Sequence, residues 1–292
     1  VAVAEYGHFA RAAEAVNLSQ PALSRSVQAL EASLGCQLLD RSPRKAVLTA
    51  HGQLVLEHAR RLLQASRSLQ NAVSQLGNLE AGELRLGAGP YPAARLIPRA
   101  LGQLVTRYPK VHVQLTIENW LTLREQLLNE RLELFVADIR EFASDPLLTI
   151  EPLHSYAGVF FCRPDHPLLK ETALDRDKLS RYPLAGTELP DEVASALGQL
   201  SGRQQLLEIQ CNNFLVLKAL VASSEVISLA PWDVVADDVN AGRLAVLPVP
   251  ANQPVQRSAY GVVTRAGHSL SPAAQAMLEQ IRREDTNGDA AR

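Results

Sequence analysis

A group of polar and basic side chains near the N-terminus has the composition of a surface that binds DNA. Ser19 and Pro21 stand where a helix begins, because serine caps helices and proline is tolerated in their first turn. In the helix that follows, Arg25 and Gln28 carry donors that can read base edges in a major groove. The residues that we expect to contact DNA are Ser19, Gln20, Pro21, Ser24, Arg25, Gln28, Arg41, Arg44 and Lys45. Their chemistry fits recognition of phosphates and base edges rather than catalysis.

Two helices joined by a tight turn would position these side chains. Residues 9–16 predict a short amphipathic helix with Ala12, Ala13 and Val16 on its inner face. In the second helix the apolar positions recur with helical spacing and predict one buried stripe, formed by Leu23, Val27, Leu30 and Leu34. The opposite face is polar, as in a helix-turn-helix that reads DNA.

A basic hairpin is expected after the second helix. Gly35 stands at a helix-stop position, and residues 37–39 and 46–48 can pair as two short strands. The tip holds Arg41, Arg44 and Lys45, whose natural partner is the phosphate backbone. An ordinary helical hairpin with a charged turn explains any one of these features. All of them in this order favour a winged helix-turn-helix.

A long helix is predicted over residues 50–76, with Thr49 as its N-cap. Leu54, Leu62 and Leu69 belong to an apolar seam whose spacing alternates between three and four residues, which is typical of a coiled coil. A seam of this length beside a small domain needs a partner helix, so we expect it to hold a dimer.

From residue 83 onwards, strands and helices alternate. This order predicts an α/β region with a mostly parallel, doubly wound sheet, followed by a second α/β unit. The expected divisions are a winged helix-turn-helix domain at 1–49, a linker helix at 50–78, a first α/β subdomain at 83–160 plus 260–284, a second at 161–259 and a disordered polar tail at 285–292. The fold class is therefore α plus α/β.

A ligand site is expected between the two α/β units, because ligands bind beyond the carboxyl ends of strands in such sheets. The loops at this position contribute Gly89, Pro90, Tyr91, Asn119, Asp138, Asn213 and Trp232. Free N–H groups at helix starts there would favour an anion. Glycine, proline and asparagine are also ordinary loop residues, so a purely structural role is the alternative for each.

The segment AEYGHFARAAEAVNLSQPALSRSVQALEASLGCQLLDR, followed by VLTAHGQ, closely resembles the N-terminal domain of LysR-type transcriptional regulators. The resemblance is dense to about residue 60 and continues more weakly to near residue 284. It implies a winged helix-turn-helix, a dimerisation helix and an effector domain of two subdomains like those of periplasmic binding proteins. By the same resemblance, roughly ten residues of the first helix would precede Val1.

The resemblance also implies a biological setting. Such a regulator is a cytoplasmic homodimer or homotetramer, binds pseudo-palindromic operators and answers to a small-molecule effector. RNA polymerase is a further implied partner, and neither a cofactor nor a metal is expected. Many relatives hold an anionic effector with Ser or Thr in the first loop, where this chain has Gly89, Pro90 and Tyr91. Carboxylate binding is therefore in doubt, and an aromatic, less polar ligand contacting Tyr91 and Trp232 is equally compatible.

Charge is distributed unevenly along the 292 residues. Up to Asn78 the chain has eight Arg or Lys and five Asp or Glu, whereas the whole chain has a net charge of -2. A basic front and an acidic remainder fit a DNA-contacting module attached to a different one. The sequence contains no run of about 18 apolar residues, so we expect no membrane span. No signal peptide is visible.

Other chemistries have weaker support. Cys36, Cys162 and Cys211 show no metal-binding spacing, and a redox pair of Cys162 and Cys211 is less favoured than two apolar fillers. Cys162 with His154 or His166 is the only nucleophile and base combination close in sequence. The rival classes are a solute-binding protein and an enzyme built on the C-terminal α/β half. The helix-turn-helix pattern argues against both.

Overall fold

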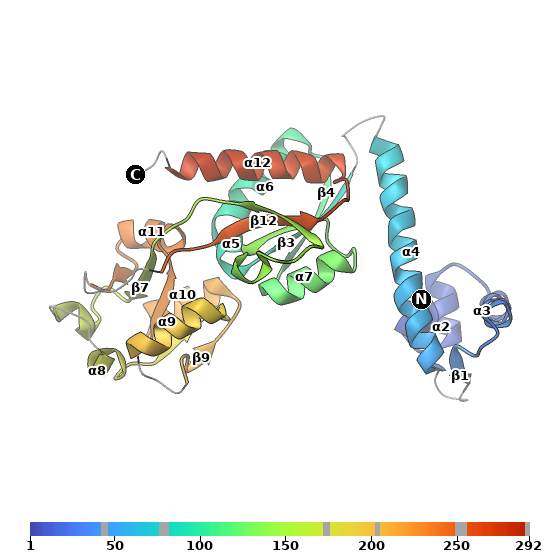
Figure 1. The fold of residues 1–292 in the computed structure, drawn as a ribbon, viewed down its shortest axis with the longest axis horizontal. Helices are drawn as coiled ribbons and strands as arrows, with labels where there is room; N and C mark the ends of the chain where they lie inside the picture. The colour runs from blue at the N-terminus through green and yellow to red at the C-terminus, as the bar shows by residue number, and fades with distance from the viewer. Residues whose placement is uncertain (42–45, 76–81, 172–175, 202–204, 249–255, 290–292) are drawn as a thin grey trace. The chain divides into compact units, whose positions relative to one another are not determined.

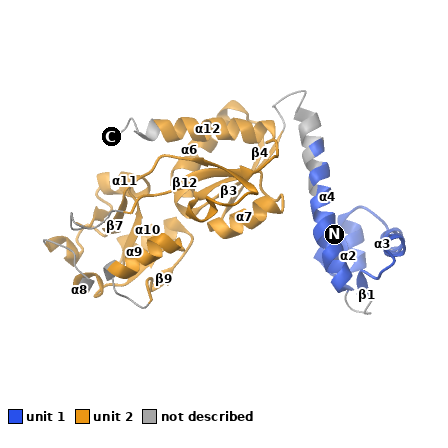
Figure 2. Ribbon diagram, in the orientation of Figure 1, with its two compact units in different colours: residues 1–70 blue, residues 71–292 orange. Residues whose placement is uncertain are grey.

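The structure is a computed structural model that describes residues 1–41, 46–75, 82–171, 176–201, 205–248 and 256–289 (Figure 1). The chain divides into two compact units, residues 1–70 and residues 71–292 (Figure 2). In its described part the first unit combines helices with a small hairpin, and the second unit contains two five-stranded sheets.

The first unit has the predicted helix-turn-helix order. Its elements are α1 (Ala2–Tyr6), α2 (Phe9–Ala15), α3 (Gln20–Leu34), β1 (Leu39–Arg41), β2 (Ala46–Leu48) and α4 (Ala50–Gln75), of which α4 continues beyond residue 70. Leu23 and Val27 pack against a small core built around Ala12. Leu30 and Leu34 are 44% and 48% exposed, so the prediction of one buried stripe was wrong for its second half. Val16 is also exposed, and the reason is the same: this small core reaches only the first turns of α3.

Hydrogen bonds tie the hairpin to the helices on either side. The Glu31 carboxylate accepts from the backbone N–H groups of Leu38 and Leu39. Thr49 caps α4 as predicted, because its hydroxyl oxygen accepts from the N–H of Gly52 at 3.0 Å. A side chain at Gly52 would collide with the Leu38 carbonyl, so glycine lets α4 start directly against the strand. The predicted strand at 37–39 instead begins at Leu39.

The first sheet of the second unit has the order β4-β3-β5-β12-β6. Its strands are β3 (Glu83–Ala88), β4 (His112–Ile117), β5 (Leu134–Asp138), β6 (Leu148–Pro152) and β12 (Tyr260–Arg265). Its helices are α5 (Pro90–Ala94), α6 (Leu96–Arg107), α7 (Trp120–Leu128) and α12 (Pro272–Asp289), with a 3-10 turn η1 (Arg140–Phe142). The predicted loop at 88–92 is partly helical, because α5 begins at Pro90.

The second sheet has the order β11-β7-β10-β8-β9. Its strands are β7 (Gly158–Cys162), β8 (Leu184–Gly186), β9 (Ile209–Gln210), β10 (Ile227–Pro231) and β11 (Ala245–Val246). Its helices are α8 (Arg176–Leu179), α9 (Asp191–Ser201), α10 (Phe214–Ala222) and α11 (Trp232–Asn240), with η2 (Pro167–Lys170) after β7. Each sheet is mixed rather than mostly parallel, since two described strand pairs are parallel and two are antiparallel.

The chain crosses between the sheets twice. The first crossing lies between β6 and β7, so the predicted boundary at residue 160 falls inside β7, which pairs with β10 of the second sheet. The second crossing precedes β12, as predicted. The predicted polar tail from residue 285 was wrong as far as Asp289, because α12 continues to that residue. The Asp285 carboxylate accepts from the backbone N–H of His154, which fixes this turn of the helix.

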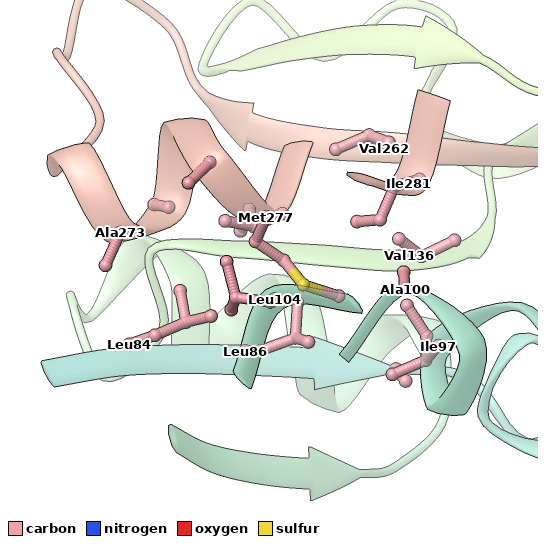
Figure 3. Packing of buried hydrophobic residues seen from close by; sticks show 14 of the residues in the cluster. Leu84, Leu86, Ile97, Ala100, Leu104, Val136, Val262, Ala273, Met277 and Ile281 are labelled. Atoms are coloured by element: carbon pink, nitrogen blue, oxygen red, sulfur yellow. The ribbon is translucent and has the colours of Figure 1, made fainter. Parts of the chain in front are cut away.

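The largest packed core lies on one face of the first sheet. Figure 3 shows Met277 of α12 reaching toward Leu86 of β3 and Leu104 of α6, all fully buried. A second cluster around Leu123 of α7 covers the other face. The second sheet also has a cluster on each face, one around Leu217 of α10 and one that includes Leu197 of α9. These layers set the positions of the loops described next.

Candidate DNA-binding surface and effector cavity

The outer face of α3 presents the side chains predicted to read DNA. The Ser19 hydroxyl oxygen accepts from the N–H of Ala22 at 3.4 Å, and Pro21 lies in the first turn. Ser19, Gln20, Pro21, Arg25 and Gln28 are exposed, and Ser24 is half-buried. The helix ends at Gly35, whose φ of 66° is left-handed. The polar surface therefore begins at a capped helix end and continues along one side of it.

The wing is the hairpin of β1 and β2 with its connecting residues 42–45, and the structure describes it only in part. β1 and β2 pair in antiparallel register, with Leu39 opposite Leu48 and Arg41 opposite Ala46. Arg44 and Lys45 lie outside the described residues, as does the side chain of Arg41. Their contact with phosphates stays a prediction.

The seam of α4 is exposed in this chain. Leu54, Leu62 and Leu69 are 56%, 71% and 65% exposed, although they are large apolar side chains. Glu57 and Arg61 form an ion pair one turn apart on the same helix. A row of exposed leucines favours a partner surface.

A cavity of about 340 Å³ opens between the two sheets of the second unit. The first sheet and its loops contribute Tyr91, Asp138, Arg140 and Tyr260 to its wall. Most of the remaining wall belongs to the second sheet, from β7, β10 and α9. The cavity therefore extends from the junction of the sheets beneath α9.

Tyr91 links the two sheets at the edge of this cavity. Its hydroxyl donates to the Leu229 carbonyl of β10 at 3.0 Å, and its ring meets the edge of Phe214 at 5.1 Å between centroids. Burial raises the pKa of Tyr91 to about 12, against the opposing effect of hydrogen bonds with Thr187. The phenol is therefore neutral at physiological pH and acts as a fixed donor.

The charged groups of the cavity wall are paired with one another. Asp138 accepts from the backbone N–H of Arg140 at 3.1 Å and forms an ion pair with the same guanidinium. The guanidinium of Arg140 also lies 3.2 Å from Glu192 and donates to the carbonyl of Arg257. Burial raises the pKa of Asp138, while Arg140 opposes this shift. Arg140 is thus engaged on all sides by the protein itself.

Among the described residues, two buried polar atoms near the junction of the sheets lack hydrogen-bond partners. They are the Tyr260 hydroxyl and one oxygen of Asp233. Burial raises the pKa of Tyr260 well above its ordinary value, and the charges of Asp233, Tyr91 and Asp138 add to the shift. Burial also raises the pKa of Asp233 to about 6, opposed by Arg95 at 3.7 Å. Unsatisfied buried groups of this kind are uncommon and call for a physical reason.

A smaller cavity of about 40 Å³ gathers most of the predicted effector residues. Gly89, Pro90, Tyr91, Asn119 and Asp138 all line it. The Asn119 side chain also caps α7 by accepting from the N–H of Thr122 at 2.8 Å. Five of the residues predicted from the sequence therefore line one cavity, and their contact with an effector stays a prediction.

Asn213 and Trp232 line neither of these cavities. The Asn213 carbonyl oxygen caps α10 by accepting from the N–H groups of Leu215 and Val216 at 3.1 and 3.3 Å. Trp232 packs against the core on the α10 side of the second sheet. A helix cap and a packing position account for these two residues without a ligand, and their contact with an effector stays a prediction.

Other cavity residues were missed from the sequence, including Tyr260, Leu229 and the face of α9 formed by Val193, Ala196 and Leu197. The i, i+3, i+4 spacing on α9 was a visible signal of an apolar face. It could not show that a cavity, rather than a packed helix, lies beneath this face.

The alternative chemistries find little support in the described residues. Burial raises the pKa of the Cys162 thiol to about 12, which keeps it from acting as a thiolate. The His166 ring accepts from the N–H of Leu168 at 3.2 Å and packs against Tyr182, so its position is structural. Within the same described ranges, no cluster of His, Cys, Asp and Glu is arranged for a metal, and no helix could span a membrane.

A helix-turn-helix unit, a long helix and a two-sheet α/β unit with an internal cavity define a DNA-binding transcription regulator with an effector-binding domain. This chain belongs to the LysR family: residues 77–286 match the LysR substrate binding domain, and residues 1–53 match the bacterial regulatory helix-turn-helix protein, lysR family. The rival classes, a solute-binding protein or an enzyme, do not account for residues 1–53.

Several known proteins resemble this chain along nearly its whole length. The SDS degradation transcriptional activation protein of a Pseudomonas species is 62% identical over 98% of this chain and 94% of its own length. The DNA-binding transcriptional dual regulator OxyR of Escherichia coli is 28% identical over 97% of this chain and 92% of its own. These relatives are transcription regulators.

Solved structures share the fold. Full-length CbnR complexed with its target DNA has a TM-score of 0.68 at 23% identity and covers 97% of this chain and 96% of its own. A full-length OxyR variant from Pseudomonas aeruginosa has a TM-score of 0.64 at 22% identity, covering 97% of this chain and 91% of its own. At these identities the likeness concerns the fold.

Proposed function

We propose that this chain activates transcription of genes for the degradation of alkyl sulfates. The observation that carries this proposal is the 62% identity, over 98% of the chain, to the SDS degradation transcriptional activation protein. That identity extends over both the helix-turn-helix unit and the α/β unit. The protein would act in the cytoplasm, where its DNA is found, with RNA polymerase as its partner in activation.

DNA recognition is assigned to α3 and the wing. Arg25 and Gln28 are exposed on the outer face of α3, where a bidentate contact to a base edge is sterically open. The start of the same helix is surrounded by four further residues that would contact the DNA backbone, namely Ser19, Gln20, Pro21 and Ser24. Arg41, Arg44 and Lys45 supply the positive charge of the wing.

A second copy of the chain is the proposed occupant of the α4 seam. Leu54, Leu62 and Leu69 repeat along 26 residues of helix, and their exposure favours a coiled-coil partner of the same periodicity. A symmetric dimer would place two copies of α3 on a pseudo-palindromic operator. A tetramer would join two such dimers.

Effector binding is assigned to the cavity between the sheets of the second unit. The larger and smaller cavities share Tyr91, Asp138 and Tyr260 on the side of the first sheet. They also share Glu188 and Pro190, which lie between β8 and α9, so a ligand there would contact both sheets. A ligand that binds one arrangement of the two sheets more tightly than another would shift the regulator between its states.

The experiment is an anisotropy titration of full-length protein against labelled DNA from upstream of an alkyl sulfatase gene. Tight, sequence-dependent binding to this DNA is expected, with much weaker binding to shuffled DNA of the same composition. A reporter fused to the same promoter should need the protein for its alkyl sulfate response. Equal affinity for promoter and shuffled DNA would contradict the proposed function.

A further inference from the structure

We infer that the larger cavity binds a neutral amphiphile, a primary long-chain alcohol, with its alkyl chain beneath α9 and its hydroxyl at Tyr260. The inference rests on the proposed function, because water splits an alkyl sulfate ester into this alcohol and sulfate. A regulator that binds the alcohol would report the product of that hydrolysis rather than the detergent itself.

The part of the cavity beneath α9 is mostly apolar, although Gln199 of the same helix also lines it. Val193, Ala196 and Leu197 lie at i, i+3 and i+4 on α9 and line one wall. Phe160 of β7 and Leu229 of β10 line the other, and they are direct cross-strand partners. With side chains of this kind on both sides, an unbranched hydrocarbon chain gains affinity by leaving water.

One buried hydroxyl of the cavity wall is without a hydrogen-bond partner among the described residues and can recognise the head of the ligand. Tyr260 lines both cavities, is 5% exposed, and its hydroxyl has no hydrogen-bond partner among the described residues. A buried hydroxyl without a partner is unfavourable, whereas a ligand hydroxyl can donate to it or accept from it. The cavity therefore offers one unpartnered buried hydroxyl next to an apolar wall, which matches the single polar group of an alcohol.

The charges around this hydroxyl disfavour an anionic head group. Arg140 is the cation at this wall nearest to Asp138, and it already pairs with Asp138 and Glu192. Glu188 also lines the cavity, and the first turn of α9 carries Asp191 and Glu192, which oppose an anion at that helix start. To pair with Arg140, a sulfate ester or a carboxylate of a ligand would have to displace the Asp138 or Glu192 carboxylate.

The second arginine of the wall is also engaged. Arg257 donates from its guanidinium to the hydroxyl of Ser155 at 3.2 Å and to the Ser155 carbonyl. Burial raises the pKa of Tyr260, and the negative charges of Asp233 and Asp138 raise it further, so an anionic head group at this hydroxyl would meet like charge. A neutral hydroxyl avoids this repulsion and keeps the hydrogen bond.

The binding test is calorimetry of the full-length protein with hexanol, octanol and decanol, and with decyl sulfate and decanoate below their micelle-forming concentrations. Affinity for the alcohols should rise about three- to fourfold for each added methylene, until the chain fills the cavity. Decanol should bind at least tenfold more tightly than decyl sulfate or decanoate. Equal or tighter binding of decyl sulfate would overturn the choice of head group, and affinity independent of chain length would overturn the choice of tail.

Variants locate the alcohol. Ala196→Trp should fill the cavity and abolish decanol binding, while Ser195→Trp on the exposed side of the same helix should leave it unchanged. Tyr260→Phe should weaken decanol by roughly three- to tenfold while keeping the gain per methylene, because only the head contact is lost. Circular dichroism establishes that each variant is folded. Decanol affinity that survives both Ala196→Trp and Tyr260→Phe would move the ligand to another site.

The failure of this inference and the failure of the proposed function give different results. If promoter DNA is bound but decanol is not, the ligand assignment is wrong and the gene assignment stands. If decanol is bound through Ala196 and Tyr260 but the sulfatase promoter is not recognised, the ligand assignment stands and the target genes are different.

Discussion

The two sheets of the second unit share one strand arrangement but differ in how they are covered. In both, three parallel strands are followed by a fourth strand that pairs antiparallel with its neighbours on either side, so β4-β3-β5-β12-β6 corresponds to β9-β8-β10-β7-β11. α5 and α6 follow β3, the second strand in this order, and α9 follows its counterpart β8. α6 packs beside α12, whereas the described residues include no such long helix beside α9. The cavity lies where that layer is incomplete.

The side chains of α6 and α9 differ in burial in the same way as the two sheets differ in covering. On α6, Ile97, Ala100 and Leu104 are fully buried. On α9, Leu197 is buried, while Val193 and Ala196 remain partly exposed along the cavity. A filled core stabilises the fold, and an unfilled one of the same topology leaves room for a ligand. Matched substitutions in the two sheets can test this contrast.

The largest expected effect is from truncation in the filled sheet. Leu104→Ala should lower the free energy of unfolding by about 2–5 kcal/mol, because it creates a void in a closed core. Leu197→Ala should cost less than half as much, because this side chain already borders a cavity. Urea unfolding of the full chain measures both. Equal losses would show that the two helices are packed equally well.

Asp233, at the start of α11, reports on the junction between the sheets. Its folded pKa of about 6 is above the ordinary 3.8, so its protonated form stabilises the fold fully below pH 3.8, and that contribution is lost as pH rises through 6. Asp233→Asn cannot titrate. The free energy of unfolding of Asp233→Asn, relative to that of wild type, should therefore rise by up to about 3 kcal/mol between about pH 4 and pH 7. A pH-independent difference would mean that Asp233 is not buried in this way.

Enlarging a helix residue should have opposite outcomes in the two sheets. Ala100→Leu should destabilise the protein by about 1–3 kcal/mol, because the first core has no room for added atoms. Ala196→Leu should be neutral or stabilising, since the new methyl groups enter the cavity. Thermal unfolding of the two variants compares them directly. Destabilisation by both would indicate that the cavity closes in solution.

Changes in the DNA-reading helix α3 should alter DNA binding without altering the stability or ligand affinity of the two sheets. Arg25→Ala should weaken binding to the cognate operator by about 1–3 kcal/mol if the guanidinium contacts a base, with unchanged unfolding because the side chain is exposed. Decanol affinity should also be unchanged. An Arg25→Ala variant with full operator affinity would remove this residue from the recognition surface.

Local features of this molecule were predictable because short-range rules govern them. Ser19 and Thr49 were placed as helix caps from their position before an apolar stripe, and both accept the expected backbone hydrogen bonds. The helix starts at Asn119 and Asn213 follow the same chemistry, since both side chains accept from backbone N–H groups of the helices that they precede. Periodicity also gave the order of strands and helices around them.

Long-range features were not predictable in the same way. The mixed direction of the strands depends on where the chain crosses between sheets, and the first crossing lies in a segment without strong periodicity. The exposure of Leu30 depends on how far a neighbouring core extends. The cavity depends on a missing neighbour for α9, and a sequence pattern shows an apolar face without showing what covers it.

The most direct test of the unfilled second sheet as the ligand site is a crystal structure with a terminally brominated decanol. We expect an anomalous bromine peak beneath α9, in contact with Ala196 or Leu197, with the alcohol oxygen within hydrogen-bond distance of the Tyr260 hydroxyl. A bromine peak within the core of the first sheet or on the surface, with the space beneath α9 empty, would contradict it.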